Sequence, residues 1–330
     1  MGRKVVQHRI FDLSVTLIIV VTLSTLRSVF MPVGDEAIVN TPTPVGILLQ
    51  NMQSNMPMLS AVVWWVSLLF AGFSVGRYAA KYSIYPAYTL MAIPVFAVLA
   101  SAVIVSGDYL VSSVALLLML LASKYIHRCV MRTKSFNDVS LAMLSFGMLP
   151  LVFAPAAILY VALPFLILSL YHSWRNLLVA LGSLALPLFA VCYWEWCAGE
   201  EFLAPARLIY SSMLGESEFK LFATLNPASI LLLGVVILMV LCGVSLIISD
   251  RYSLKTNSRS VMLFNALVMF VVVGMFFLPS STATTFAILA VPVAMLVPLV
   301  FVRMGTGFTE TLYRLMLLAA VANMVAMCWM

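Results

Sequence analysis

Charged residues are scarce in this chain of 330 residues: Asp, Glu, Lys and Arg together make up 9%, against about 25% in typical soluble domains. Hydrophobic residues make up 64%, and the mean hydropathy is +1.11. A soluble domain of this size has too little interior to hide so much apolar surface, which excludes that class. The apolar residues also come in blocks of roughly 17 to 25, the length of a membrane-crossing helix. The composition therefore predicts an all-α fold, a polytopic transmembrane helical bundle.

The sequence motifs of familiar enzyme classes are missing as well. There is no glycine-rich phosphate loop, no nucleophile elbow, no His-Glu-x-x-His and no Cys/His cluster. The five cysteines are scattered, and we expect them to be buried as small apolar residues. The only histidines are His8, His127 and His172, which we expect on the cytoplasmic side as solvated or headgroup-facing residues without a function.

The net charge of +6 does not indicate nucleic-acid binding, because the basic residues form short clusters between apolar blocks rather than one stripe. Lys and Arg remain on the cytoplasmic side of membrane proteins. Applied to these clusters, that rule predicts about eleven spans in a single transmembrane domain, 1–330, with the N-terminus inside and the C-terminus outside. The predicted spans are 11–30, 59–76, 84–105, 109–123, 137–153, 156–171, 176–196, 226–249, 261–278, 283–302 and 310–329.

Two outer loops, 31–58 and 197–225, are long enough to carry a function. In the first, VGILLQNMQSNMPML predicts a short helix in the membrane interface. The mixture of apolar and charged residues in the second predicts an amphipathic helix lying flat on the outer leaflet. Prolines predict a hinge near residues 154–155 and a kinked helix around Pro292 and Pro298.

The stretch RSVFMPVGDEAIVN brings Arg27, Asp35 and Glu36 to one membrane depth. Arg27 lies about sixteen residues, or roughly 24 Å of helix, into the first predicted span, and so near the outer boundary. An arginine at that depth can simply extend to water beside two solvated acids. It can also hold a lipid phosphate, while a neighbouring carboxylate binds a divalent cation or deprotonates an acceptor hydroxyl. The residues by themselves leave both interpretations open.

This acidic pair after the first span resembles the signature of the C-type, polyprenyl-phosphate-dependent glycosyltransferases. The resemblance implies transfer of sugars from a polyprenyl-phosphate carrier at the outer leaflet, with the first-loop acid as base or metal ligand. Such enzymes usually have a longer first outer loop and a second acidic motif. In this chain only Asp108 or the pair Glu200 and Glu201 can supply the second acids.

A second resemblance covers most of the chain by its layout. The paired spans over 137–171, followed by HSWRNLLVALGSLALPLFAVCYW, resemble a family of polytopic inner-membrane proteins from Bacteroidota. Its members have an aromatic-Arg cytoplasmic turn, here Trp174 and Arg175, leading to a helix with Gly and Pro, here Gly182 and Pro187. This family has no established activity, and the resemblance implies a multi-pass protein of the bacterial inner membrane.

The leading hypothesis is therefore a membrane glycosyltransferase-like protein that uses a lipid-linked sugar at the outer leaflet. A divalent cation is its candidate cofactor, and membrane lipids and a polyprenyl-phosphate-linked sugar are its expected partners. The alternative is a non-enzymatic subunit or scaffold of a cell-envelope assembly, which binds a protein partner through 197–225. A secondary transporter is disfavoured, since ionisable residues near the midplane are nearly absent. The candidate residues are Asp35 and Glu36 as catalytic groups, with Asp35 also the candidate metal ligand, and Arg27, Asp108, Glu200 and Glu201 as substrate-binding groups.

Overall fold

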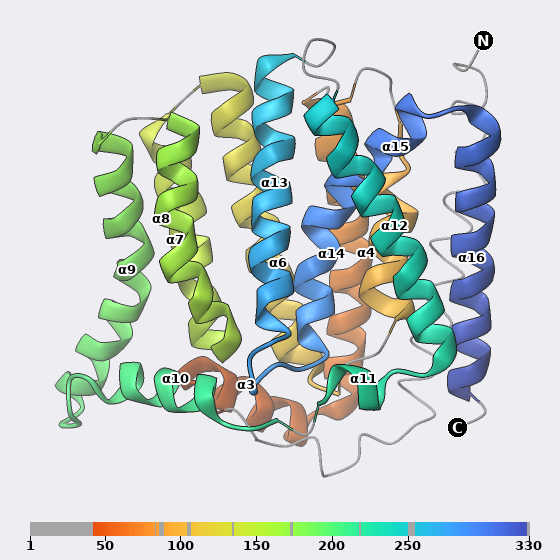
Figure 1. The fold of residues 1–330 in the computed structure, drawn as a ribbon. Helices are drawn as coiled ribbons and strands as arrows, with labels where there is room; N and C mark the ends of the chain where they lie inside the picture. Colours follow the sequence, from red (N-terminus) through yellow and green to blue (C-terminus); the bar gives the residue numbers. More distant parts are fainter. Residues whose placement is uncertain are drawn as a thin grey trace.

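The structure is a computed structural model, and every regular element that it describes is a helix. The described residues are 42–82, 84–85, 89–103, 107–133, 135–171, 174–217, 219–249 and 255–328. Most of the helices stand side by side in one bundle, and a few short ones lie at its end (Figure 1). The elements are α3 (Pro44–Asn55), α4 (Pro57–Lys81), α5 (Ala92–Ala97), the π-helix η2 (Val98–Ala102), α6 (Tyr109–Arg128), the π-helix η3 (Cys129–Thr133), α7 (Phe136–Val152), the 3₁₀ helix η4 (Ala154–Ala157), α8 (Ile158–Tyr171), α9 (Trp174–Cys197), α10 (Ala204–Leu214), α11 (Leu221–Thr224), α12 (Pro227–Ser249), α13 (Thr256–Met275), α14 (Thr284–Leu296), α15 (Pro298–Arg303) and α16 (Thr306–Cys328).

Six of the described helices are long and apolar enough to cross a membrane, which indicates a membrane protein. They are Pro57–Tyr78, Tyr109–Met131, Trp174–Cys197, Pro227–Ser249, Thr256–Met275 and Thr284–Arg303. The first predicted span, 11–30, lies outside the described residues.

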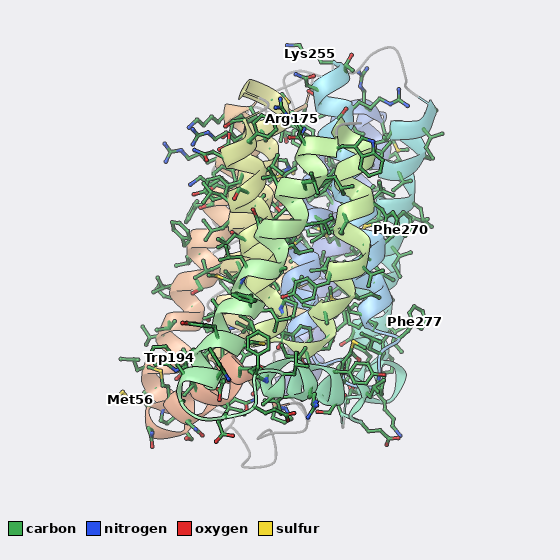
Figure 2. The ribbon with its side chains drawn as sticks, turned by 90° about the vertical axis from the view of Figure 1, so that its left-hand side faces the viewer. Met56, Arg175, Trp194, Lys255, Phe270 and Phe277 are labelled. Atoms are coloured by element: carbon green, nitrogen blue, oxygen red, sulfur yellow. The ribbon has the colours of Figure 1, made fainter. Side chains whose placement is uncertain are left out.

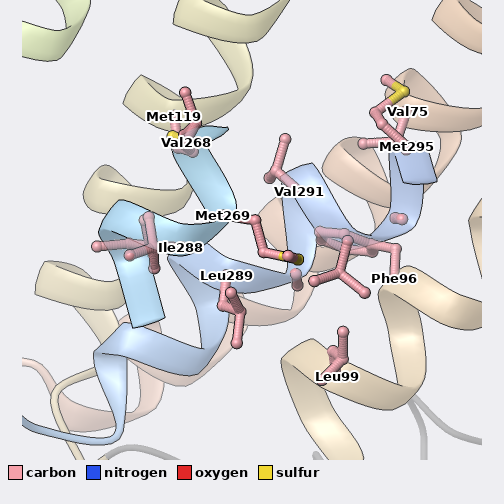
Figure 3. Close-up of a cluster of buried hydrophobic side chains, with 14 of the residues drawn as sticks. Val75, Phe96, Leu99, Met119, Val268, Met269, Ile288, Leu289, Val291 and Met295 are labelled. Carbon is pink, nitrogen blue, oxygen red and sulfur yellow. The ribbon is translucent and has the colours of Figure 1, made fainter. Parts of the chain in front are cut away.

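Helix α14 lies at the centre of the bundle, and all of its residues are buried. It packs against α5, η2, α6 and α13. Figure 3 shows this contact, with Ile288 and Val291 of α14 among Phe96, Met119 and Met269 of its neighbours. A helix that is apolar on every side is suited to such a central place. The outer helices α4, α9 and α12 instead expose many apolar side chains, as lipid-facing helices do.

The predicted hinge is confirmed, and the helix predicted to be kinked is interrupted at Pro298. Helix α7 ends at Val152, Phe153 has an extended backbone, and the 3₁₀ turn of η4 leads into α8, so the hinge lies where it was predicted. The second break separates α14 from α15 directly before Pro298, which has no N–H to continue the helix. There, the Tyr85 hydroxyl donates a hydrogen bond to the carbonyl oxygen of Met295 at 2.7 Å. This bond satisfies a backbone group beside the break.

The predicted span 84–105 is wrong in its first part. Residues 84–85 and 89–91 are not helical, and the helix begins only at Ala92 and passes into the π-helix η2. The end of this interrupted segment is held by Asn323 of α16, whose amide donates to the carbonyl oxygens of Ala102 and Val103. Ser229 of α12 in turn donates to the Asn323 side-chain oxygen at 2.6 Å. These buried side chains take over bonds that a regular helix would make internally.

The two ends of the bundle differ in their residues. Lys255 and Arg175 lie at one end, and Trp194 and Met56 lie at the other (Figure 2). Helices α3, α10 and α11 also lie at this second end, which we call the loop end (Figure 1). Both outer loops of the sequence analysis therefore contain a helix, as predicted, and both helices are at one end of the molecule.

Candidate functional site

At the loop end, helices α3 and α10 lie against each other and against the ends of the upright helices. The hydroxyl of Ser212 on α10 donates to the carbonyl oxygen of Pro42, immediately before α3. The next residue, Thr43, caps α3 by accepting from the Gly46 N–H at 3.1 Å, and its hydroxyl donates to the carbonyl oxygen of Val152 at 3.0 Å. The two predicted loops are thus joined to each other and to the hinge after α7.

The end of α10 and the segment after it are also held by hydrogen bonds. Ser280 donates to the carbonyl oxygen of Met213 at 2.9 Å, at the end of α10. The Ser217 N–H donates to Pro279, and its hydroxyl donates to Ser281 at 2.5 Å. The turn between α13 and α14 is therefore bound to the segment that follows α10.

Of the predicted second acids, Asp108 lies against α3. It directly precedes α6, and the side chain of Gln53 on α3 contacts the backbone on both sides of it. The Gln53 amide donates to the Gly107 carbonyl oxygen at 2.7 Å, and its oxygen accepts from the Leu110 N–H at 3.2 Å. This glutamine therefore performs the usual task of an N-cap side chain from a different helix.

The carboxyl group of Asp108 is mostly enclosed beneath α3. Burial raises the pKa of Asp108 to about 6, and a hydrogen bond from the side chain of Gln50 opposes part of that rise. The Gln50 side-chain oxygen is buried and has no hydrogen-bond partner. A protonated Asp108 can donate to that oxygen after a rotation of the amide, so one glutamine can serve both protonation states.

Glu200 and Glu201 are not held in the same way. Both lie exposed in the turn between α9 and α10, and Glu201 forms an ion pair of 2.5 Å with Arg207, which is itself exposed. Exposed pairs of this kind contribute little to stability. The structure thus gives the two acids different partners, Arg207 for Glu201 and Gln50 for Asp108.

The remaining predicted site residues, Arg27, Asp35 and Glu36, lie outside the described residues, and so does Asp35 as the candidate metal ligand. Within the described ranges, no group of three or more His, Cys, Asp or Glu side chains could hold a metal ion. The chain re-enters the described part at Pro42, which α10 holds through Ser212.

The prediction for His127 is wrong. This side chain is fully buried between α6 and α13, where Asn265 donates to its Nε2 at 2.9 Å. Asn265 also donates to the Val261 carbonyl oxygen at 2.8 Å, which fixes the orientation of the amide. The His127 Nδ1 atom is buried without a hydrogen-bond partner. Asn265 is a polar residue inside an apolar block, and this feature of the sequence could have indicated a buried polar pair.

The expected burial of the cysteines is correct for Cys129 and Cys192 and wrong for Cys197, which is exposed at the end of α9. Cys129, Cys192, Cys197 and Cys242 are free, so Cys192 and Cys197 form no disulfide with each other.

Comparisons of the chain with protein-family models, with curated proteins and with solved structures give no match. The functional argument therefore rests on the residues of the loop end.

Proposed function

We propose that the chain is a multi-pass protein of the bacterial inner membrane, with about eleven spans, its N-terminus inside and its C-terminus outside. The separation of Lys255 and Arg175 from Trp194 and Met56 supports this orientation (Figure 2). In it, the loop end faces the outside of the cell.

The topology is tested by single cysteines in a full chain whose own five cysteines are replaced by alanine or serine. Asn51→Cys on α3 and Ser211→Cys on α10 are exposed at the loop end, and Thr256→Cys is exposed at the other end. An impermeant thiol reagent added to intact cells should label the first two and not the third. Labelling of Thr256→Cys alone contradicts the proposed orientation.

We further propose that the protein is a glycosyltransferase-like enzyme that uses a lipid-linked sugar at the outer leaflet. The observation that carries this proposal is the enclosed carboxyl group of Asp108, whose pKa of about 6 suits a group that takes up and releases a proton. It lies outside the apolar helices and beside α3, which Asp35 and Glu36 precede in the sequence. Arg27 would hold the carrier phosphate from the end of the first span.

In the proposed reaction, a carboxylate accepts the proton of the acceptor hydroxyl. The acceptor oxygen then bonds to the sugar C1, while the bond between C1 and the phosphate oxygen of the carrier breaks. Asp35 or Asp108 is the base, and the remaining acids orient the acceptor. A divalent cation, if bound near Asp35, would neutralise the departing phosphate.

The test is sugar transfer by the purified full chain in lipid nanodiscs, using a panel of polyprenyl-monophosphate and polyprenyl-diphosphate sugars. Of Asp35→Asn and Asp108→Asn, the variant that removes the base should lower the rate by about 10²- to 10⁴-fold, the usual contribution of a positioned base. Glu216→Gln, exposed in the segment after α10, is the matched control and should retain the rate. A chain that consumes none of these donors, with the helices intact, would contradict the enzyme proposal.

The alternative, a scaffold of an envelope assembly, is favoured by one observation. Helix α10 and its approach expose Leu203, Tyr210 and Leu214, although the opposite face of the helix is buried. A protein partner could cover these side chains at the outer surface. Tyr210→Glu should then abolish co-purification of that partner, while Ser211→Glu, also exposed, should not.

A further inference from the structure

Helix α3 presents three kinds of surface. Gly46 and Gln53 face inward and are buried. On the outward side, Asn51 and Ser54 form a polar flank. Leu48 and Met52, one helical turn apart, form an apolar flank beside it and are 62% and 59% exposed. Two neighbouring apolar side chains that are so exposed indicate that this flank contacts an apolar medium rather than water.

The apolar flank continues directly into the lipid-facing surface of α4. Met56, which is 59% exposed, is the one residue between α3 and α4. From there an exposed apolar row follows α4, one of the six helices that are long and apolar enough to cross a membrane. The row consists of Met58, Leu59, Val62, Val66, Phe70 and Phe73. The flank of α3 is therefore an extension of a surface that lipid covers along the span.

The position of this corner agrees with the level of the membrane surface. Met56 and Trp194 both lie at the loop end, on the same side of the view in Figure 2. Trp194 is 75% exposed, and exposed tryptophans of membrane proteins gather at the boundary between hydrocarbon and headgroups. Methionine adapts to an irregular apolar surface because its side chain is unbranched and flexible.

We infer that α3 is an interfacial helix whose flank Leu48, Met52 and Met56 is inserted among the phospholipid chains of the leaflet at the loop end. Its polar flank, Asn51 and Ser54, faces water. The same helix holds Asp108 and the start of α6 through Gln50 and Gln53. The lipid surface therefore positions the site through one rigid helix. This assignment stands on its own and does not require the proposed enzyme activity.

The inference is tested by spin labels on single cysteines in the full chain, with its own cysteines replaced by alanine or serine. The chain is reconstituted in vesicles of phosphatidylcholine and phosphatidylglycerol. Collisions with oxygen, which concentrates in hydrocarbon, and with a water-soluble nickel chelate are measured at Met52→Cys. Asn51→Cys is its matched neighbour, Phe70→Cys is the lipid reference and Glu200→Cys is the water reference.

We expect Met52→Cys to match the lipid reference, with frequent oxygen collisions and few nickel collisions, and Asn51→Cys to match the water reference. Nickel collisions at Met52→Cys as frequent as at Glu200→Cys would overturn the inference, because the flank would then be in water. Few collisions with either reagent would overturn it as well, since a second copy or a protein partner would then cover the flank. If Met52→Cys fails to fold, Leu48→Cys replaces it, because that side chain is equally exposed on the same flank.

Discussion

Gln53 on α3 accepts a hydrogen bond from the backbone N–H of Leu110, 57 residues further along the chain, and so caps α6 from outside it. The same side chain donates to Gly107, so one buried glutamine satisfies two backbone groups around Asp108. A helix that lies across the end of the bundle thereby fixes where an upright helix begins.

Loss of this cap should destabilise the protein. Gln53→Ala leaves a backbone N–H and a carbonyl oxygen without partners in a place that is mostly buried, at a cost of about 1 to 3 kcal/mol for such groups. The measurement is the unfolding temperature of the purified chain in detergent. Ser54→Ala is the control, since its hydroxyl is exposed and bonds only to Asn51 in its own helix. Equal unfolding temperatures for the two variants would contradict the role given to Gln53.

The raised pKa of Asp108 predicts how stability depends on pH. Because the pKa is about 6 in the folded state and 3.8 as the reference value, the folded state binds more protons between these values. The free energy of unfolding should therefore fall as the pH rises from about 4 to 6, by at most about 3 kcal/mol from this group. Asp108→Asn should remove that part of the pH dependence. If Asp108→Asn shows the same difference in unfolding temperature between pH 4 and pH 7 as the unmodified chain, Asp108 is not the source of this pH dependence.

The rate of the proposed reaction should depend on Asp108 with the opposite sign, so that it rises with pH while stability falls. A base must be ionised, so the transfer rate should fall as the pH decreases through about 6 if Asp108 is the base. If Asp35 is the base instead, Asp108→Asn should leave the position of this fall unchanged. The measurement is the rate of sugar transfer between pH 4.5 and 8 for the unmodified chain and the variant.

The class of the fold follows from the sequence because length and hydropathy alone decide which segments can cross a membrane. Proline positions predict the breaks near residue 154 and Pro298, since the missing N–H acts locally. The irregular segment before Ala92 could not be predicted, because buried residues are apolar whether or not they are helical. The burial of His127 could not be predicted either, since its neighbours in sequence are basic while its partner Asn265 is 138 residues away.

For the candidate site, the sequence offers either Asp108 or the pair Glu200 and Glu201 as the second acidic group. Only the tertiary contacts of Gln50 and Gln53 show that Asp108 is enclosed, while Glu200 and Glu201 are exposed.

The buried pair His127 and Asn265 gives a prediction about non-additive substitutions. Asn265→Leu leaves His127 without its donor, and His127→Leu leaves a buried N–H of Asn265 unpaired, so each should cost about 1 to 3 kcal/mol. The double variant removes both polar groups and should be less destabilised than the sum of the two. The check is a double-mutant cycle of unfolding free energies, and additive losses would contradict direct pairing.

Two glycines give the sharpest test of the packing between α7 and α9. A Cβ atom at Gly147 would overlap the carbonyl oxygen of Leu184 and come within 3.2 Å of Pro187, and backbone cannot move aside as a flexible side chain can. Gly182 on α9 has no atom within 4 Å of the corresponding position. Gly147→Ala should therefore force the two helices apart and destabilise the chain by about 1 to 3 kcal/mol. Gly182→Ala should be neutral or stabilise it by up to about 1 kcal/mol, because alanine favours a helix over glycine. Unfolding temperatures measured side by side in one detergent decide the matter: if Gly147→Ala is tolerated as well as Gly182→Ala, the close approach of α7 to the backbone of α9 is not present in the folded protein.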